Sequence, residues 1–273
     1  MGRIIYVTKP TEAARRAEHI LRQTLGDHQV SIDKDVVVAV GGDGTMLRAV
    51  REYSGDDVLF AGVAAGSLGL LQTVEAEDVS QLAEGLSGGG YETIKAPMLA
   101  ASYCRPEGQN AKDDQQLDVI GYGFNDISVE RAGAKAAKFH LKIDDSSGSF
   151  IGDGVIFSTP LGSTAYSLAA GGPIVDTESE DIFLITPNNP HLSTIHSSLQ
   201  RPHVLSKHRK IRIEVNPEDK GEHAAKLVID GETALGVIAD PINIYVSSHS
   251  VKLVQLAGKG IKNRIETKRL GRL

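Results

Sequence analysis

The sequence lacks the features that mark secreted, membrane-spanning and nucleic-acid-binding proteins. Its 273 residues include one cysteine, Cys104, so the chain cannot form an internal disulfide, which fits a reducing compartment. No apolar run approaches the length that spans a bilayer, and the first residues have the pattern of a strand rather than of a signal peptide. The formal net charge of −6 argues against nucleic acid as the main partner. These absences predict a cytoplasmic globular protein that is not attached to a membrane.

Residues 1–95 are predicted to form an α/β domain with a Rossmann-like parallel sheet. Three apolar runs, at residues 3–8, 35–40 and 58–64, have the composition of strands, and a segment with helical spacing follows each of them. Strands that alternate with helices in this way form βαβ units. The inward faces expected for the three helices are Ala14, Ala17, Leu21 and Leu25; Met46, Leu47, Val50 and Tyr53; and Val79, Leu82, Ala83 and Leu86. Ligands of such sheets bind outside the carboxyl ends of the strands, where Asp43 falls.

The second part of the chain, residues 96–256, is predicted to be an all-β domain with a sandwich-like or layered architecture. After the glycines of residues 87–90, helical spacing disappears and short β-rich runs take its place. These runs are residues 98–104, 119–129, 137–143, 155–159, 182–186, 210–215, 226–229 and 242–246. The polar segment 105–116 is expected to be a hairpin loop. The basic tail, residues 257–273, is expected to pack back on the first domain.

A glycine-rich corner joins the second predicted strand to the second predicted helix. Gly41, Gly42 and Gly44 allow a tight turn with exposed backbone N–H groups, and the helix start adds partial positive charge, so this corner and Thr45 suit a phosphate. Asp43 lies at the same corner, where a carboxylate can bind a metal ion or take a proton from a hydroxyl. Two plainer explanations remain open at this point: the glycines serve only a sharp turn, and Asp43 only caps the following helix.

A second block, residues 152–173, holds the densest cluster of glycines and hydroxyl-bearing residues in the chain. Such residues offer hydrogen-bonding groups and close backbone approach along a groove, and Tyr166 offers a flat face on which a base can stack. The alternative is a β-arch whose hydroxyls bond to their own backbone. Between the two blocks, Asn125 and Asp126 place an amide and a carboxylate at an expected strand end or bulge, although such pairs are also ordinary turn formers.

These three blocks, in this order, resemble the NAD kinase family, which phosphorylates the 2′-hydroxyl of the adenosine ribose of NAD to give NADP. The resemblance rests on Gly-Gly-Asp-Gly-Thr at 41–45, Asn-Asp at 125–126, Gly-Asp-Gly at 152–154, Gly-Ser-Thr-Ala-Tyr-Ser at 162–167 and Gly-Gly-Pro at 171–173. The first motif also resembles those of lipid kinases and phosphofructokinases, whereas the long third block is specific. The resemblance implies an α/β domain, a β domain and a nucleotide in the cleft between them.

The resemblance also implies roles for individual residues. Asp43 would be the proton acceptor for the ribose hydroxyl, and from its chemistry it could equally orient that hydroxyl or hold Mg²⁺. The other expected NAD contacts are Gly44, Asn125, Asp126, Asp153, Thr164, Ala165, Tyr166, Ser167, Leu168, Ala169 and Glu232. ATP with Mg²⁺ or another divalent cation would supply the phosphoryl group, and no further metal ligands are expected. The family also implies a homodimer or homotetramer.

Some positions depart from the family's pattern. Ala64, Leu70 and Leu161 stand where Asn, Phe and Thr are common, which bears on the fit of NAD and on the choice between NAD and NADH. Two other functions stay open. A kinase of another small molecule or lipid would leave residues 152–173 unexplained, and the intact Asp43 argues against a non-catalytic NAD-binding sensor.

Overall fold

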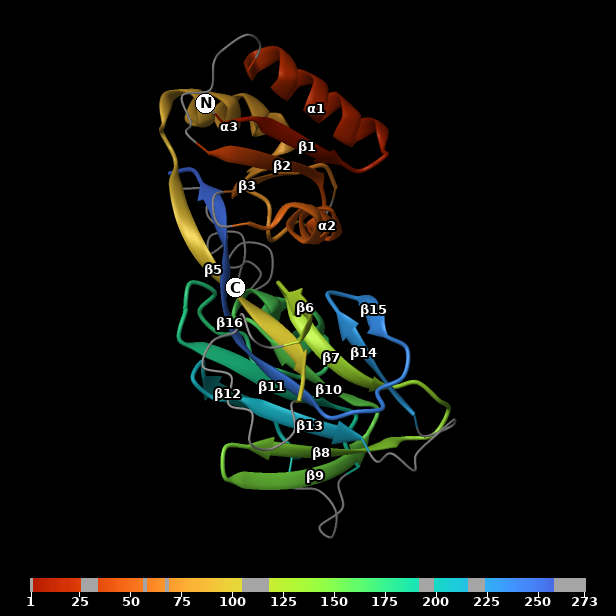
Figure 1. The fold of residues 1–273 in the computed structure, drawn as a ribbon. Coiled ribbons are helices and arrows are strands. Elements are labelled where there is room, and N and C mark those ends of the chain that lie inside the picture. The colour runs from red at the N-terminus through yellow and green to blue at the C-terminus, as the bar shows by residue number, and fades with distance from the viewer. Residues whose placement is uncertain are drawn as a thin grey trace, which may run out of the picture. The chain divides into compact units, whose positions relative to one another are not determined.

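The computed structural model describes residues 2–25, 34–55, 58–66, 69–104, 118–191, 199–215 and 224–257 (Figure 1). The chain forms two compact units, Met1–Ala96 with His249–Leu273 and Pro97–Ser248. Two long strands, β5 (Glu92–Tyr103) and β16 (Ile242–Gln255), each begin in one unit and end in the other. The first unit therefore takes in the C-terminal part of β16. The tail from residue 258 and the expected hairpin loop at 105–116 lie outside the described residues.

The first unit is built on a parallel sheet. Its strands are β1 (Ile4–Thr8), β2 (Asp35–Gly41), β3 (Val58–Ala64), the short β4 (Val74–Glu75) and the end of β16. β1, β2 and β3 are parallel neighbours in that order, and both β4 and β16 pair with β3 in parallel. All but the first residue of β2 and of β3 are buried, which explains why their apolar runs are continuous rather than alternating.

Helices cover both faces of this parallel sheet (Figure 1). α1 (Glu12–Leu25) and α3 (Val79–Gly88), the latter preceded by a 3₁₀ turn at Ala76–Asp78, share one core with alternate residues of β2. Both helices bury all the residues that the sequence predicts for their inward faces. α2 (Asp43–Tyr53) packs on the opposite face. The first unit thus has the α/β architecture that the sequence predicts.

The inward face of α2 differs from the prediction at its C-terminal end. Met46 and Val50 are buried as expected, and Ala49 is buried between them, but Leu47 is only half-buried and Tyr53 is exposed. The buried stripe places Leu47 to one side, and Tyr53 is the last residue of the helix, where contact with the sheet ends. The prediction was therefore wrong for these two residues.

The second unit is a sandwich of two antiparallel layers. One layer is a six-stranded sheet in the order β12-β11-β10-β7-β14-β15. Its strands are β7 (Asp126–Arg131), β10 (Gly154–Ser158), β11 (Ile182–Asn188), β12 (His203–Ser206), β14 (Ala225–Ile229) and β15 (Glu232–Leu235). The other layer combines parts of β5 and β16 with β6 (Val119–Gly123), β8 (Ala137–Ile143), β9 (Ser146–Gly152) and β13 (Ile211–Val215).

Alternate apolar residues from both layers fill one core, as for Ile127 and Val129 of β7 and Ile211 and Ile213 of β13. The expected β domain is confirmed in its architecture. Three strands, β9, β12 and β15, were not predicted, and all three lie at the ends of the strand orders. Edge strands bury fewer side chains, so their sequences carry a weaker apolar alternation. No helix in the described part of the chain is long and apolar enough to cross a membrane.

Candidate active site

The glycine corner of the first unit holds Asp43 in one orientation. Asp43 is the first residue of α2, and its Oδ2 and Oδ1 accept hydrogen bonds from the backbone N–H groups of Leu70 (3.1 Å) and Leu71 (2.9 Å). The residue before it, Gly42, is the N-cap, with no side-chain cap. The explanation that Asp43 merely caps α2 is therefore wrong, because its carboxylate is bound to the loop after β3.

The loop that supplies these two N–H groups is anchored below Asp43 by Thr73. The Thr73 side chain accepts a hydrogen bond from the N–H of Gly62 in β3 and donates one to the carbonyl of Val254 in β16, both of 3.0 Å. Thr73 is almost fully buried, so both bonds are shielded from water. Leu70 and Leu71 bind Asp43 through backbone N–H groups, which every residue except proline has. The sequence could therefore not have indicated these partners of Asp43.

The residue after Asp43 leaves open space beside it. Gly44 is exposed, and a Cβ placed on it would meet nothing within 4 Å. The N–H of Thr45 donates to the carbonyl of Gly42 (2.9 Å), so the donors that the start of α2 offers to an anion are the N–H groups that precede it. The arrangement of Gly41, Gly42 and Thr45 at this start is the corner that the sequence predicts.

In the second unit, Asn125 and Asp126 lie on a turn that a distant carboxylate organises. Asp230 accepts hydrogen bonds from the backbone N–H groups of Phe124 (2.8 Å), Asn125 (2.7 Å) and Asp126 (3.1 Å). It lies just after β14 with a positive φ of 47°, a conformation that Asp tolerates better than most residues. Asp230 is not among the site residues predicted from the sequence. An Asp-Gly pair after a predicted strand was the available signal.

Asn125 and Asp126 are both buried, with exposed fractions of 8% and 5%. The side-chain Oδ1 of Asn125 has no hydrogen-bond partner among the described residues. Burial, together with the nearby carboxylates of Asp230 and Glu130, raises the pKa of Asp126 from its ordinary 3.8 to about 7. Within the described part of the chain, the turn therefore presents an acceptor without a partner beside a carboxyl group that is partly protonated near neutral pH.

The hydroxyl-rich block 158–172 packs directly on this turn. Thr159 donates from its backbone N–H to the carbonyl of Asn125 (2.9 Å) and from its Oγ1 to that of Phe124 (2.8 Å). A Cβ on Gly162 would lie 1.9 Å from the carbonyl oxygen of Asn125, so only glycine fits there. The block continues as a 3₁₀ turn, Leu161–Thr164, and a short helix, α4 (Tyr166–Ala169), rather than as a β-arch.

Several hydroxyls of this block point inward. Ser163 and Thr164 donate to the carbonyls of Pro160 (2.6 Å) and Leu161 (3.0 Å), and Ser167 shares a 2.8 Å hydrogen bond with Thr186. These serine and threonine side chains are buried. The alternative that the hydroxyls bond locally thus holds for part of the block. The residues on its outer side are Tyr166 and Ala169, which are exposed, and Ala165 and Leu168, which are half-buried.

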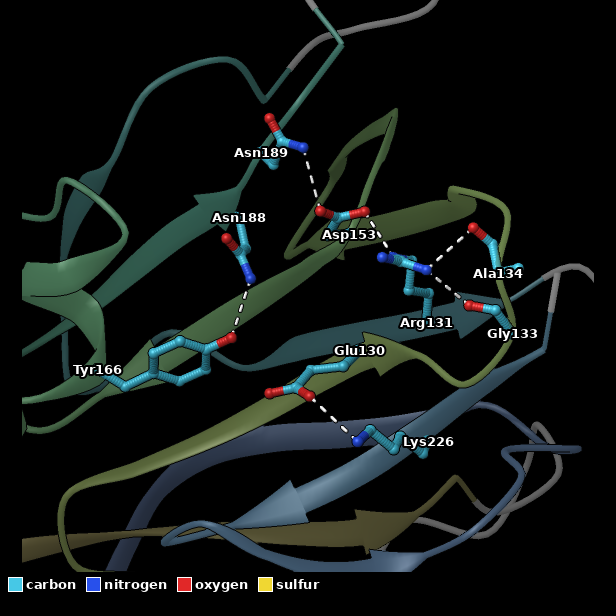
Figure 2. A network of polar contacts seen from close by, with 9 residues as sticks. All are labelled: Glu130, Arg131, Gly133, Ala134, Asp153, Tyr166, Asn188, Asn189 and Lys226. Atoms are coloured by element: carbon cyan, nitrogen blue, oxygen red, sulfur yellow. Dashed lines mark hydrogen bonds and ion pairs between the residues drawn. The ribbon is translucent and has the colours of Figure 1, made fainter. Parts of the chain in front are cut away.

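Asp153, the residue before β10, belongs to a polar network at the start of that strand (Figure 2). Its two carboxylate oxygens accept hydrogen bonds from Arg131 Nε (2.7 Å) and Asn189 Nδ2 (3.1 Å), and Arg131 also binds the carbonyls of Gly133 and Ala134. Asp153 is thus engaged on both oxygens. Glu232, the first residue of β15, is exposed and pairs in register with Ile229.

The structure brings Asn125, Asp126 and the block after Thr159 together within the second unit, and Asp43 with Gly44 and Leu70 within the first. Among the described residues, no group of three or more His, Cys, Asp or Glu side chains could hold a metal ion. Asp43 supplies a carboxylate at the glycine corner.

Two family models match the chain. The ATP-NAD kinase N-terminal domain matches residues 6–91, and the ATP-NAD kinase C-terminal domain matches residues 125–256. The NAD kinase of Clostridium botulinum (strain Loch Maree / Type A3) is 34% identical over 244 residues, 89% of this chain and 80% of that protein. The NAD kinase of Sulfurimonas denitrificans is 32% identical over 224 residues, 81% of this chain and 72% of that protein.

Solved structures show the same fold. The yeast NADH kinase complexed with NADH has a TM-score of 0.78 and 21% identity, with 98% of this chain and 87% of that chain covered. An NAD kinase from Archaeoglobus fulgidus in complex with ATP has a TM-score of 0.68 and 23% identity, with 98% of this chain and 96% of that chain covered.

Proposed function

The chain belongs to the ATP-NAD kinase family and converts NAD to NADP with ATP as phosphoryl donor, and we propose that Asp43 is the residue beside the reacting hydroxyl. The observation that supports this assignment is that the N–H groups of Leu70 and Leu71 donate hydrogen bonds to the carboxylate of Asp43. This carboxylate lies next to the open space at Gly44. Phosphoryl transfer depends mainly on positioning and charge stabilisation, and a carboxylate fixed on both oxygens is already positioned.

In the proposed reaction, the 2′-hydroxyl of the adenosine ribose donates a hydrogen bond to Asp43, which orients it toward the γ-phosphorus of ATP and receives its proton. The hydroxyl oxygen forms the new bond to this phosphorus while the bond from the phosphorus to the β-phosphate oxygen breaks and ADP leaves. Each carboxylate oxygen has a second lone pair, so Asp43 can accept this bond without releasing Leu70 or Leu71. The absent side chain of Gly44 leaves space for the ribose. The N–H groups at the start of α2, with Gly41, Gly42 and Thr45, bind phosphate oxygens.

We propose that the second unit binds the rest of NAD. The buried Oδ1 of Asn125, which has no partner among the residues that the structure describes, supports a role as acceptor for a donor on the ligand, because an unsatisfied buried acceptor is costly without one. Asp126, Tyr166, Ala165, Leu168, Ala169 and Glu232 complete the proposed contacts. For Asp153, Thr164 and Ser167, whose polar atoms already bind protein groups, we propose that they act by shaping the surface that meets NAD.

The proposed cation is Mg²⁺ brought by the phosphates of ATP, where it neutralises charge that develops on transfer. Asp43 is the residue that would hold it, because its carboxylate lies at the start of α2, where the phosphates are proposed to bind. We further propose that the protein acts in the cytoplasm as a homodimer or homotetramer. Sedimentation of the purified protein tests the proposed oligomeric state.

The test of the assignment is NADP formation from NAD and MgATP by the wild type, by Asp43→Asn and by Asp145→Asn. Asp145 is an exposed carboxylate in the turn between β8 and β9, so its variant controls for the loss of one charge. We expect product from the wild type and the control and almost none from Asp43→Asn, with NAD still bound. Full activity of Asp43→Asn would remove Asp43 from the reaction.

A further inference from the structure

A row of four residues crosses the six-stranded sheet on the face turned away from the core. In register, Asn188 of β11 lies opposite Gly154 of β10, Gly154 opposite Glu130 of β7, and Glu130 opposite Lys226 of β14. The residues that alternate with them, such as Val129 and Val155, are part of the core. The row therefore carries an amide, a gap, a carboxylate and an ammonium group side by side.

The gap in the row is required by the backbone. A Cβ on Gly154 would lie 2.6 Å from the carbonyl oxygen of Val129 and 3.1 Å from the Cα of Glu130. The Tyr166 hydroxyl points to this part of the row, between Asn188 and Glu130 (Figure 2). Asn188 Nδ2 donates a 2.9 Å hydrogen bond to the Tyr166 hydroxyl oxygen. The phenol oxygen of Tyr166 thus already accepts one hydrogen bond, and its own O–H group can donate to another acceptor.

Glu130 is placed to receive that proton in a hydrogen bond. Its Oε1 accepts a 2.8 Å hydrogen bond from Ser128 Oγ, and its Oε2 lies 3.5 Å from Lys226 Nζ. Its side chain is 20% exposed, so these partners fix a largely buried carboxylate. Burial raises the pKa of Tyr166, and the charge of Glu130 and its hydrogen bond with Tyr166 raise it further, as expected for a phenol that donates to a carboxylate.

We propose that Glu130 and Asn188 are positioning residues that lock the exposed ring of Tyr166 in the orientation in which it packs on NAD. This inference rests on the proposed contact between Tyr166 and NAD. A ring that is 37% exposed would otherwise sample several rotamers and lose that freedom on binding. The row of side chains on β11, β7 and β14 restricts the rotamers of Tyr166 before NAD binds. Lys226 holds Glu130 in place, so the side chains of Asn188, Glu130 and Lys226 all serve one aromatic ring.

The proposal is tested with Glu130→Gln, Asn188→Ala and the control Glu214→Gln. Like Glu130, Glu214 pairs with a basic side chain, but its partner Arg212 lies on the same strand, β13, which belongs to the other layer. Because the chain has no tryptophan, tyrosinate absorbance in the near ultraviolet reports on its tyrosines alone, and subtraction of a Tyr166→Phe titration isolates Tyr166. We expect Glu130→Gln to lower the pKa of Tyr166 and the control to leave it unchanged.

Steady-state kinetics supply the second readout. In Glu130→Gln and Asn188→Ala we expect the KM for NAD to rise about three- to tenfold, the cost of immobilising one side chain, while kcat changes less than about twofold. An unchanged pKa of Tyr166 in Glu130→Gln would overturn the proposal, and so would a lowered pKa with an unchanged KM. Failure of the wild type to form NADP would instead overturn the proposed function, since the titration reads the row without any substrate.

Discussion

The carboxylate of Asp230 accepts a hydrogen bond of 2.7 Å from the backbone N–H of Asn125, a residue 105 positions earlier in the chain. The N–H groups of Phe124 and Asp126 bind the same carboxylate. The turn that presents Asn125 and Asp126 is thus shaped by a residue at the end of β14, whose side chain binds three of its backbone N–H groups.

Replacement of Asp230 is therefore expected to loosen this turn. Asp230→Gly keeps the positive φ of 47° accessible but leaves three N–H groups without their charged acceptor. We expect the free energy of unfolding to fall by about 2–3 kcal/mol and the KM for NAD to rise. Urea denaturation measures the first effect. Asp144→Gly, at an exposed position with a φ of 51°, is the matched control and should change stability by less than about 1 kcal/mol.

Asp126 is expected to make stability depend on pH. Its pKa is about 7 in the folded protein against an ordinary 3.8, so between these values the folded state binds more protons than the unfolded state. The free energy of unfolding therefore falls as pH rises through this window. The difference corresponds to at most about 4 kcal/mol. Denaturation curves at about pH 4.5 and pH 7.5, for the wild type and Asp126→Asn, measure it.

The variant Asp126→Asn is neutral at every pH and keeps the shape of the protonated carboxyl group. Its stability should lose this component of the pH dependence, and near neutral pH it should unfold less easily than the wild type. Equal pH slopes for the two proteins would contradict the environment described for Asp126.

Asn125 is predicted to separate binding from stability. Its Oδ1 has no partner among the described residues, so Asn125→Ala removes no side-chain hydrogen bond of that oxygen within this part of the protein. We expect the free energy of unfolding to change by less than about 1 kcal/mol, while the KM for NAD rises about tenfold, which is the loss of one hydrogen bond in a buried site. A large loss of stability with an unchanged KM would assign Asn125 to the fold instead.

Two glycines should respond to the same substitution in opposite ways. Gly162→Ala places a Cβ 1.9 Å from the carbonyl oxygen of Asn125, which neither backbone can avoid, so we expect destabilisation by more than about 3 kcal/mol. Gly44→Ala meets nothing within 4 Å and should raise helix stability by up to about 1 kcal/mol.

The activity of Gly44→Ala is the decisive measurement in this pair. If the space at Gly44 receives the ribose, NADP formation should drop although the protein is at least as stable as the wild type. Wild-type activity in a well-folded Gly44→Ala would place the substrate elsewhere.

The sequence was most informative where burial is continuous or strictly periodic. β3 and the inward faces of α1 and α3 were predicted residue by residue, because their apolar residues follow one geometric rule. The edge strands β9, β12 and β15 follow no such rule, since only part of each is covered. The run 119–129 was predicted as one strand, but a turn at Phe124 and Asn125 divides it into β6 and β7.

For the candidate site, the sequence indicated residue types but not partners. Asp43, Asn125 and Asp126 stand out by motif, whereas the groups that hold them are backbone N–H groups and a carboxylate distant in sequence. Ser167 shows the converse. Its hydroxyl suggested contact with a ligand, but it is fully buried and bonded to Thr186, a pairing that depends on how α4 packs on β11.

The hydrogen bond from Thr73 to Val254 joins residues 181 positions apart. The Asp43 corner therefore cannot be complete until the ribosome has made Val254. The ribosome makes the first three strands early, but the strand that completes this sheet, and the carbonyl that anchors the loop below Asp43, come only after the whole second unit. We expect the nascent first unit to stay open to proteases until β16 emerges. Protection of arrested chains that end before Ile242 would contradict this. The Asp43 corner would then mature only after β16 is made, although Asp43 itself is made long before that strand.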